Sequence, residues 1–187
     1  LDPAECGPAC LSLCQDVQGE TFEYPEEFFK ERIHNIRRPK PDDFQIKQAV
    51  ERIKNSKNPI IISGGGVFYS DAMDELGNFA VKHNIPVTQT VMGYSTMKKD
   101  HSHFVGPIGG LGGKAANNLA KETDLAICIG TKLADFTTGS WANFENPEFK
   151  LVSINIARHD ANKHLAEAVI GDAKVTLTEL SNAIGDW

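Results

Sequence analysis

Short apolar runs alternate with amphipathic helical patterns along residues 42–187, and this alternation constrains the fold most. The clearest run, residues 59–63 (PIIIS), has no polar side chain before Ser63. Such a run predicts a strand buried on both faces, and strands separated by helices predict βαβ units in a parallel sheet. We therefore predict an α/β fold: a Rossmann-like, doubly wound, mainly parallel sheet of about six strands with helices on both faces. The expected strands are residues 59–63, 85–90, 103–106, 124–130, 150–156 and 167–171.

The helical patterns have recognisable starts and apolar faces. Asp42 or Asp43 can cap the first helix through a side-chain oxygen. We place another helix start near Ser70 or Asp71, and the last at Asp172. Apolar side chains then recur at the i, i+3, i+4, i+7 spacing of a helix with one buried face. The residues expected to face the core are Ile46, Ala49, Val50 and Ile53 in the first helix, Ala72, Leu76, Phe79 and Ala80 in the second, and Ala173, Leu177, Leu180 and Ile184 in the last.

Residues 1–41 lack this alternation. Residues 1–20 hold a short apolar run between Gly/Pro positions and a polar stop, which predicts one strand. Residues 21–41 are aromatic and then basic, and close with Pro39 and Pro41. That composition is typical of a linker packed on a neighbouring surface. Its basic side chains indicate an anion patch or, more commonly, a solvated or domain-bridging face; they are Lys30, Arg32, Arg37, Arg38 and Lys40.

Charge and cysteine spacing exclude several classes of function. The formal net charge is −6, which argues against a nucleic acid or an anionic membrane surface as partner. No apolar run approaches the ~20 residues of a membrane helix. The cysteines at 6, 10, 14 and 128 lack the tight pairing of metal sites. We therefore expect a cytoplasmic protein with reduced thiols and no metal ligands in this chain.

Glycines are concentrated where strands of the predicted sheet end. In open parallel sheets, ligands bind beyond the carboxyl ends of the strands. Residues 64–66 follow a strand directly, and residues 106–117 (GPIGGLGGKAAN) are expected to lead into a helix. Glycine lets the backbone approach an anion, and helix amino termini favour phosphate. The sequence thus raises two readings for these glycines, a phosphate cradle or close packing of turn against helix.

Neither glycine stretch completes a nucleotide-binding motif, so we favour the packing reading. Tyr69 stands where the last glycine of G-x-G-x-x-G is expected, and the match at 110–115 does not follow a strong strand. We identify no catalytic residue. The residues that would line a pocket at this edge are Gly64, Gly65, Gly66, Gly110, Gly112, Thr131, Asp135 and Asn155.

Several loop residues are chemically able to act as general acids or bases, although capping and loop hydrogen bonding are their commoner roles. They are Asp135, His159, Asp160 and His164.

Longer stretches resemble a known family. NPIIISGGGVFYSDAMDELGNFAVKHNIPVTQT, DLAICIGTKLADF and FKLVSINI resemble the central domain of thiamine-diphosphate-dependent enzymes, the group of acetolactate synthase and pyruvate oxidase. CGPACLSLCQDVQ resembles the last strand of their amino-terminal, pyrimidine-binding domain. QDVQGE, YPEEFFKERIHNIRRP, DFTTGSWANFENP and SINIARHDANKH are similar to the trihydroxycyclohexanedione hydrolases of myo-inositol catabolism.

The resemblance implies a domain organisation and a reaction. Residues 1–20 would be the tail of the pyrimidine-binding domain, 21–41 a linker and 42–187 the central domain. The implied reaction is hydrolytic ring opening of 3D-(3,5/4)-trihydroxycyclohexane-1,2-dione to 5-deoxy-glucuronate with thiamine diphosphate and Mg2+, in which the cofactor carries the chemistry. The family's activating glutamate and its G-D-G…N-N metal-diphosphate motif belong to the flanking domains, so we expect this chain alone to be inactive.

The resemblance also bears on ligands and partners. Family members that bind FAD or ADP in this domain commonly have an acid where this chain has Asn155, so neither nucleotide is expected here. The expected partners are the two flanking thiamine-diphosphate-binding domains of the same chain, in a homo-oligomer. Without its parent sheet, the segment 1–20 is expected to be loosely ordered or paired with another chain. Two alternatives stay open: a nucleotide (FAD/ADP)-binding regulatory module, and the central domain of an acetolactate-synthase-like enzyme.

Overall fold

The computed structural model describes residues 2–187, and the contacts divide the chain after Arg37 into two units. In the first unit, residues 2–37 form two short helices, α1 (Gln15–Gln18) and the 3-10 helix η1 (Glu26–Phe29). The strand predicted in residues 1–20 is wrong: residues 2–20 contain no strand, and Leu1 lies outside the described residues. A strand needs a neighbour to take its backbone hydrogen bonds, and the first unit offers none.

Aromatic side chains gather in the second half of this first unit. The ring of Tyr24 lies 5.3 Å from that of Phe22, 4.8 Å from that of Phe28 and 6.1 Å from that of Phe29, measured between centroids. All four rings are more than half exposed. Their only described partners are one another.

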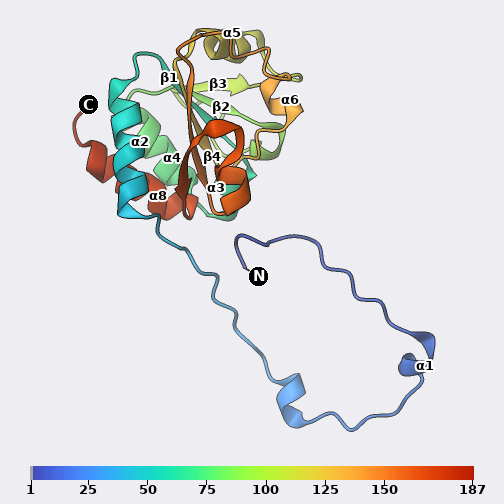
Figure 1. The fold of residues 1–187 in the computed structure, drawn as a ribbon. Coiled ribbons are helices and arrows are strands. Elements are labelled where there is room, and N and C mark those ends of the chain that lie inside the picture. The colour runs from blue at the N-terminus through green and yellow to red at the C-terminus, as the bar shows by residue number, and fades with distance from the viewer. Residues whose placement is uncertain (1) are drawn as a thin grey trace. The chain divides into compact units, whose positions relative to one another are not determined.

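The second unit, residues 38–187, is built on a six-stranded sheet in which every strand pair is parallel. The strand order is β3-β2-β1-β4-β5-β6 (Figure 1), which is the doubly wound Rossmann order with its switch point between β1 and β4. The predicted fold class is therefore confirmed. The strands are β1 (Pro59–Ser63), β2 (Val87–Gln89), β3 (Phe104–Pro107), β4 (Leu125–Ile129), β5 (Lys150–Asn155) and β6 (Glu167–Ile170).

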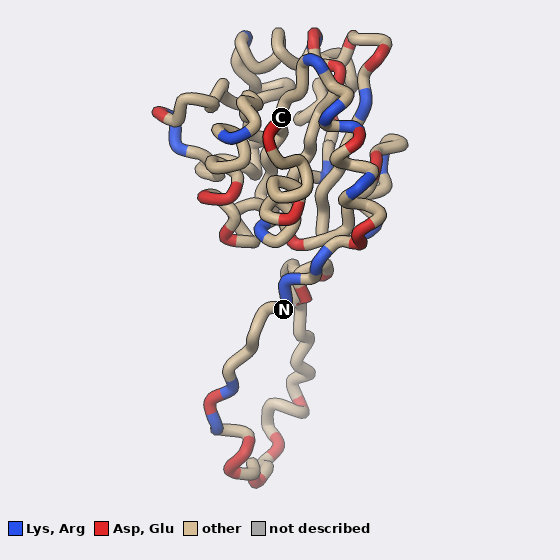
Figure 2. Tube along the Cα trace, turned by 90° about the vertical axis from the view of Figure 1, so that its left-hand side faces the viewer, with Lys and Arg blue, Asp and Glu red and all other residues tan. Residues whose placement is uncertain are grey.

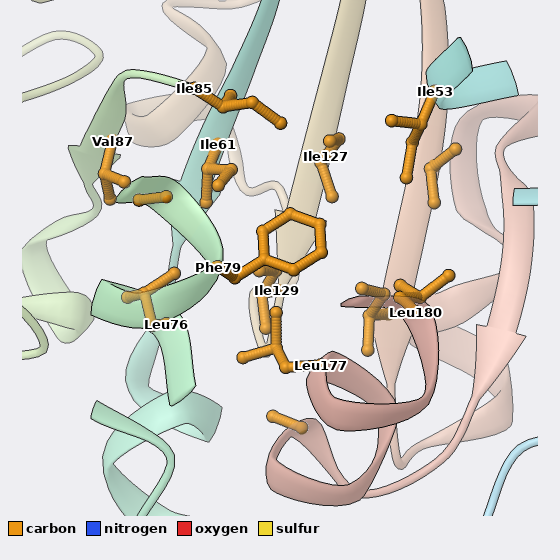
Figure 3. Close-up of a cluster of buried hydrophobic side chains, with 14 of the residues drawn as sticks. Ile53, Ile61, Leu76, Phe79, Ile85, Val87, Ile127, Ile129, Leu177 and Leu180 are labelled. Carbon is orange, nitrogen blue, oxygen red and sulfur yellow. The ribbon is translucent and has the colours of Figure 1, made fainter. Parts of the chain in front are cut away.

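Helices cover both faces of this sheet, as the continuous apolar strands require. On one face α2 (Asp43–Asn55), α4 (Met73–Lys82) and α8 (Ala173–Ile184) enclose the larger core cluster. Figure 3 shows the Phe79 ring of α4 among Ile127, Ile129 and Leu177. On the other face α5 (Lys114–Glu122) packs Ala116 and Ala120 onto Ile60 and Ile62. All twelve helix positions predicted to face the core are buried or packed against it.

Two aspartates start helices as the sequence predicts. The Asp42 carboxylate accepts the amide of Phe44 at 2.8 Å and begins α2. The Asp172 carboxylate accepts the amides of Lys174 and Val175 and begins α8. These bonds satisfy amides that have no partner within the helix.

The predicted start of the second helix is wrong by one to two residues, and an additional helix precedes it. Residues Gly65–Tyr69 form the short helix α3, and α4 begins only after Ala72. Asp71 separates the two, because its φ of 53° is left-handed and interrupts the helical path. The remaining short helices are η2 (Val91–Gly93), α6 (Asp135–Thr138), α7 (Arg158–Ala161) and η3 (Lys163–Leu165).

Charges of both signs are interspersed over the second unit (Figure 2). Four of the five basic side chains named for residues 21–41 have acidic partners. Lys30 pairs with Glu27 and Arg37 with Asp2 in the first unit. In the second unit, Arg38 pairs with Asp172 and Lys40 with Glu179. These pairs support a structural role over an anion patch.

At the amino edge of the sheet, Asp124 holds the turn before β1 against the start of β4. Its carboxylate accepts the hydroxyl of Ser56 and the backbone amides of Lys57 at 2.7 Å and Asn58 at 3.0 Å. Partial burial opposes ionisation of Asp124, but these three hydrogen bonds outweigh it and hold its pKa below the ordinary 3.8.

We predict that Asp124→Asn lowers the free energy of unfolding at pH 7 by about 1–2 kcal/mol, because the amide group cannot accept all three bonds. A lowered pKa stabilises the fold above the ordinary value, and this contribution is lost as the pH falls through the folded-state pKa. The difference from the unsubstituted chain should therefore shrink below pH 4 in urea unfolding experiments. Asp100→Asn, at an exposed position, is the control, and a pH-independent difference for Asp124→Asn would contradict the account.

Candidate functional site

The loops after β1 and β4 meet at the switch point through glycine backbone. A Cβ atom at Gly64 would lie 2.3 Å from the carbonyl oxygen of Gly130, and one at Gly66 would lie 2.6 Å from the Gly130 Cα. Gly130 itself has a φ of +60°, which favours glycine. No side chain fits between these two loops, so the three glycines permit a close backbone contact.

Most of the amides that a phosphate would need are already bonded at this contact. The Gly64 amide donates to the Ile129 carbonyl at 2.8 Å, and the Gly66 amide donates to the Gly130 carbonyl at 3.0 Å. Of Gly64, Gly65 and Gly66, only Gly65 has an amide without a backbone hydrogen bond among the described residues. A phosphate cradle presents several free amides together, and this turn leaves one.

The second glycine stretch is also closed on itself. The Gly110 amide donates to the Phe136 carbonyl at 2.7 Å, and the Gly112 amide to the Gly109 carbonyl at 2.8 Å. The Asn117 side chain of α5 brackets Gly109, accepting from its amide at 2.9 Å and donating to its carbonyl at 3.0 Å. This loop is therefore fixed by α5 and α6 without an external ligand.

Asn155 joins two of the candidate loops. Its side-chain nitrogen donates to the Thr131 carbonyl at 3.1 Å, and its side-chain oxygen accepts the Ala157 amide at 3.0 Å. Asn155 and Thr131 are both buried, and each is 8% exposed. An aspartate could not donate the first bond and would place its charge against a carbonyl oxygen. The amide at position 155 thus has a packing role in this chain.

The structure brings most of the candidate residues together, but not those of acid–base type. Gly64, Gly65, Gly66, Thr131 and Asn155 lie at the switch point, and Gly110 and Gly112 lie beside α6.

Asp135 begins α6 and is exposed, and His159 is exposed on α7. Asp160 pairs with Lys163, whereas His164 lies against the Trp141 ring at 4.6 Å. No two of these four side chains bond to each other in residues 2–187.

The described cavities lie away from the eight residues predicted to line a pocket, although the acid–base candidate His164 lines one of them. The largest, about 610 Å3, lies at the amino edge of the sheet, lined by residues such as Ser56, Asn58 and Asp124. A cavity of about 390 Å3 is lined by Trp141, Phe149 and His164 among others, and a third lies between α2 and α8. None of the eight candidate residues lines any of these three cavities.

The described residues offer little for metal binding or nucleophilic chemistry. Within residues 2–187 no three His, Cys, Asp or Glu side chains are placed to hold a metal ion. Complete burial raises the pKa of the Cys128 thiol, which keeps it protonated and unreactive. No helix in this part of the chain is long and apolar enough to cross a membrane.

Sequence reasoning missed one feature of this edge, a series of exposed apolar side chains on the loops that carry the glycines. Phe68 and Tyr69 follow β1, Met92 and Tyr94 follow β2, and Phe136 follows β4, all more than half exposed. The signal was present as bulky residues next to the glycines in GGGVFYS and VMGYS. Periodicity does not identify them, because they belong to loops and to helices of five residues or fewer.

Comparisons with known proteins agree with this fold. Residues 46–180 match the family described as "Thiamine pyrophosphate enzyme, central domain". The chain is 47% identical to a 3D-(3,5/4)-trihydroxycyclohexane-1,2-dione hydrolase of Clostridium perfringens and 48% identical to one of Clostridium botulinum, over 96% of this chain and 28% of each relative. The crystal structure of benzoylformate decarboxylase from Polynucleobacter necessarius superposes with a TM-score of 0.68 at 20% identity, covering 92% of this chain and 32% of that chain.

The glycine contact predicts that Gly64→Ala destabilises the chain by about 3 kcal/mol, because the added methyl group forces the Gly130 backbone away. Gly77→Ala is the matched control: a Cβ there meets no described atom closer than 3.5 Å, and alanine in the interior of α4 should add about 0.5–1 kcal/mol. Urea unfolding of both variants measures the difference. Equal stability of the two variants would show that the backbone contact is not tight.

Proposed function

Because the chain belongs to the thiamine pyrophosphate enzyme family as a central domain, we propose that it is the supporting central domain of a longer hydrolase. The proposed reaction of the whole protein is ring opening of 3D-(3,5/4)-trihydroxycyclohexane-1,2-dione to 5-deoxy-glucuronate in myo-inositol catabolism. The observation that carries this proposal is the identity of 47–48% over 96% of the chain to relatives of that name. The chain spans 28% of the length of those relatives.

The residues present do not fit thiamine diphosphate, which supplies the C–C bond chemistry when it is bound. Most glycine amides at the carboxyl edge bond to the chain itself, and residues 2–187 contain no acidic cluster for a metal ion. We propose that the cofactor and Mg2+ are bound by the two flanking domains, in a cytoplasmic homo-oligomer. The role of this domain is then to hold those domains in place rather than to bind the cofactor.

The sequence left two alternatives open, and the names of the relatives support the main proposal over both. A nucleotide-binding regulatory module is favoured by one observation, the Rossmann strand order, since nucleotides bind at its switch point. An acetolactate-synthase-like enzyme would keep the family but change the reaction. The reactions are separated by giving the longer protein the cyclic dione or pyruvate as substrate.

We expect the longer protein to hydrolyse the cyclic dione when thiamine diphosphate and Mg2+ are supplied. Chain 1–187 alone should neither turn over this substrate nor bind the cofactor. Isothermal titration calorimetry of the purified chain tests the second point. Micromolar binding of thiamine diphosphate to this chain, or turnover of pyruvate in place of the dione by the longer protein, would contradict the proposal.

The regulatory alternative is tested by thermal melting of the chain with FAD, ADP or NAD. A ligand at ~100 times its dissociation constant adds about 2.7 kcal/mol of stability, which corresponds to roughly 5–10 °C for a chain of this size. We expect no shift, because the switch-point amides are bonded internally and Asn155 is engaged with Thr131. A saturable shift with any of the three nucleotides would favour the regulatory module.

A further inference from the structure

Large apolar side chains are exposed at the carboxyl edge of the sheet. Seven large apolar side chains there are between 56% and 74% exposed. They lie on the four loops and short helices that follow β1, β2, β3 and β4, so sheet topology brings them to one edge although they span residues 68–136. We call this the carboxyl-edge apolar surface; it consists of Phe68, Tyr69, Val91, Met92, Tyr94, Leu111 and Phe136.

The glycines connect the parts of this surface. A Cβ atom at Gly65 would lie 3.0 Å from the Met92 carbonyl oxygen, and one at Gly93 would lie 2.2 Å from the Ser63 carbonyl oxygen, so η2 packs directly on the end of β1. On the other side, Gly110 lies next to the Phe136 ring. These glycines thus bring the loops and short helices that carry the apolar side chains into direct contact.

The opposite edge of the sheet has a different composition. The cavity there is lined by polar and charged side chains, among them Lys57, Asn58, Asp124 and Lys150. Soluble proteins tolerate single exposed apolar residues, whereas clusters of them mark surfaces that another body covers. The contrast between the edges therefore indicates that the carboxyl edge is covered in the working protein.

The first residues of the second unit, Arg38 and Pro39, are bonded at the same edge. Arg38 donates to the Ser70 carbonyl at the end of α3 and pairs with Asp172, which follows β6, at 3.0 Å. The Asp172 amide in turn donates to the Pro39 carbonyl at 2.9 Å. Ser70 directly follows Phe68 and Tyr69, so the attachment point of everything before residue 38 borders the apolar surface.

We propose that the carboxyl-edge apolar surface docks the domain that precedes residue 38 in the longer protein. This inference rests on the proposed place of the chain as a central domain. One observation selects this occupant: Arg38 and Pro39, through which the preceding chain is attached, are bonded beside the surface. The relatives are long enough to include further domains, since the chain spans 28% of them. A tethered partner has a high effective concentration, so a modest surface suffices to hold it.

Carbene photolabelling read by mass spectrometry tests the docking. Tyr69, Met92 and Tyr94 should be labelled at least about threefold less in the longer protein than in chain 1–187, because a docked domain removes them from solvent. Val81 near the end of α4 and Leu165 just before β6 are exposed apolar controls at the opposite, amino edge of the sheet and should keep their labelling.

Three results would overturn the proposal. The first is equal labelling of the carboxyl-edge surface in the two proteins, and the second is an equal loss of labelling at the surface and at the controls. The third is protection already present in chain 1–187 that disappears on dilution, which would identify a second copy as the occupant.

A charged variant gives an independent readout. Met92→Asp combined with Tyr94→Asp should leave the melting temperature of chain 1–187 within about 2 °C, since both side chains are exposed. In the longer protein the same pair should restore labelling of Tyr69 about threefold or more, because two buried carboxylates disfavour docking, while Val81→Asp should not. Unchanged Tyr69 labelling in the double variant would contradict the proposal. The labelling does not depend on which substrate the enzyme uses, so it can fail or succeed separately from the proposed reaction.

Discussion

The close contact between the Gly64–Gly66 backbone and Gly130 is the constraint on which the carboxyl edge of this domain depends. It joins the two strands at which the sheet reverses its winding, because β1 and β4 are neighbours in the strand order. The contact positions α3, and α3 in turn presents the Ser70 carbonyl to Arg38. It also uses the amides that would otherwise face a ligand. A side chain at Gly64, Gly66 or Gly130 would separate loops that now touch.

This constraint is consistent with the supporting role that we propose for a fold of the nucleotide-binding type. The strand order that forms a nucleotide crevice in other proteins is present here, yet the amides of Gly64 and Gly66 bond within the chain and Asn155 bonds to Thr131. Function on a shared fold is decided by the site and not by the topology. In this chain the loops at the switch point carry apolar side chains outward, which suits contact with another domain better than contact with a phosphate.

The buried part of the structure could be predicted from the sequence because burial leaves a periodic pattern. Ile61 and Ile127 lie in continuous apolar runs, Leu177 and Leu180 follow the helical spacing, and Asp172 marks a helix start. The extra helix α3 could not be predicted, because glycine has a low helix propensity and the sequence does not show that Asp71 adopts a left-handed conformation. The strand expected in residues 1–20 failed for another reason: residues 2–37 contain no second strand that could pair with it. At the site, glycine position was predictable, but which amides are already bonded depends on contacts between β1 and β4 that only the fold supplies.

The central claim is that the switch-point glycines serve packing, and residue-resolved NMR tests it most directly. Amide chemical shifts of Gly64, Gly65, Gly66 and Gly130 would be followed while inorganic pyrophosphate is added to the chain at constant ionic strength. The account predicts that these four amides do not shift beyond the small, non-saturating changes seen on exposed loops such as residues 98–100. Saturable shifts centred on Gly64–Gly66 would show that these amides open to bind an anion and would contradict the account.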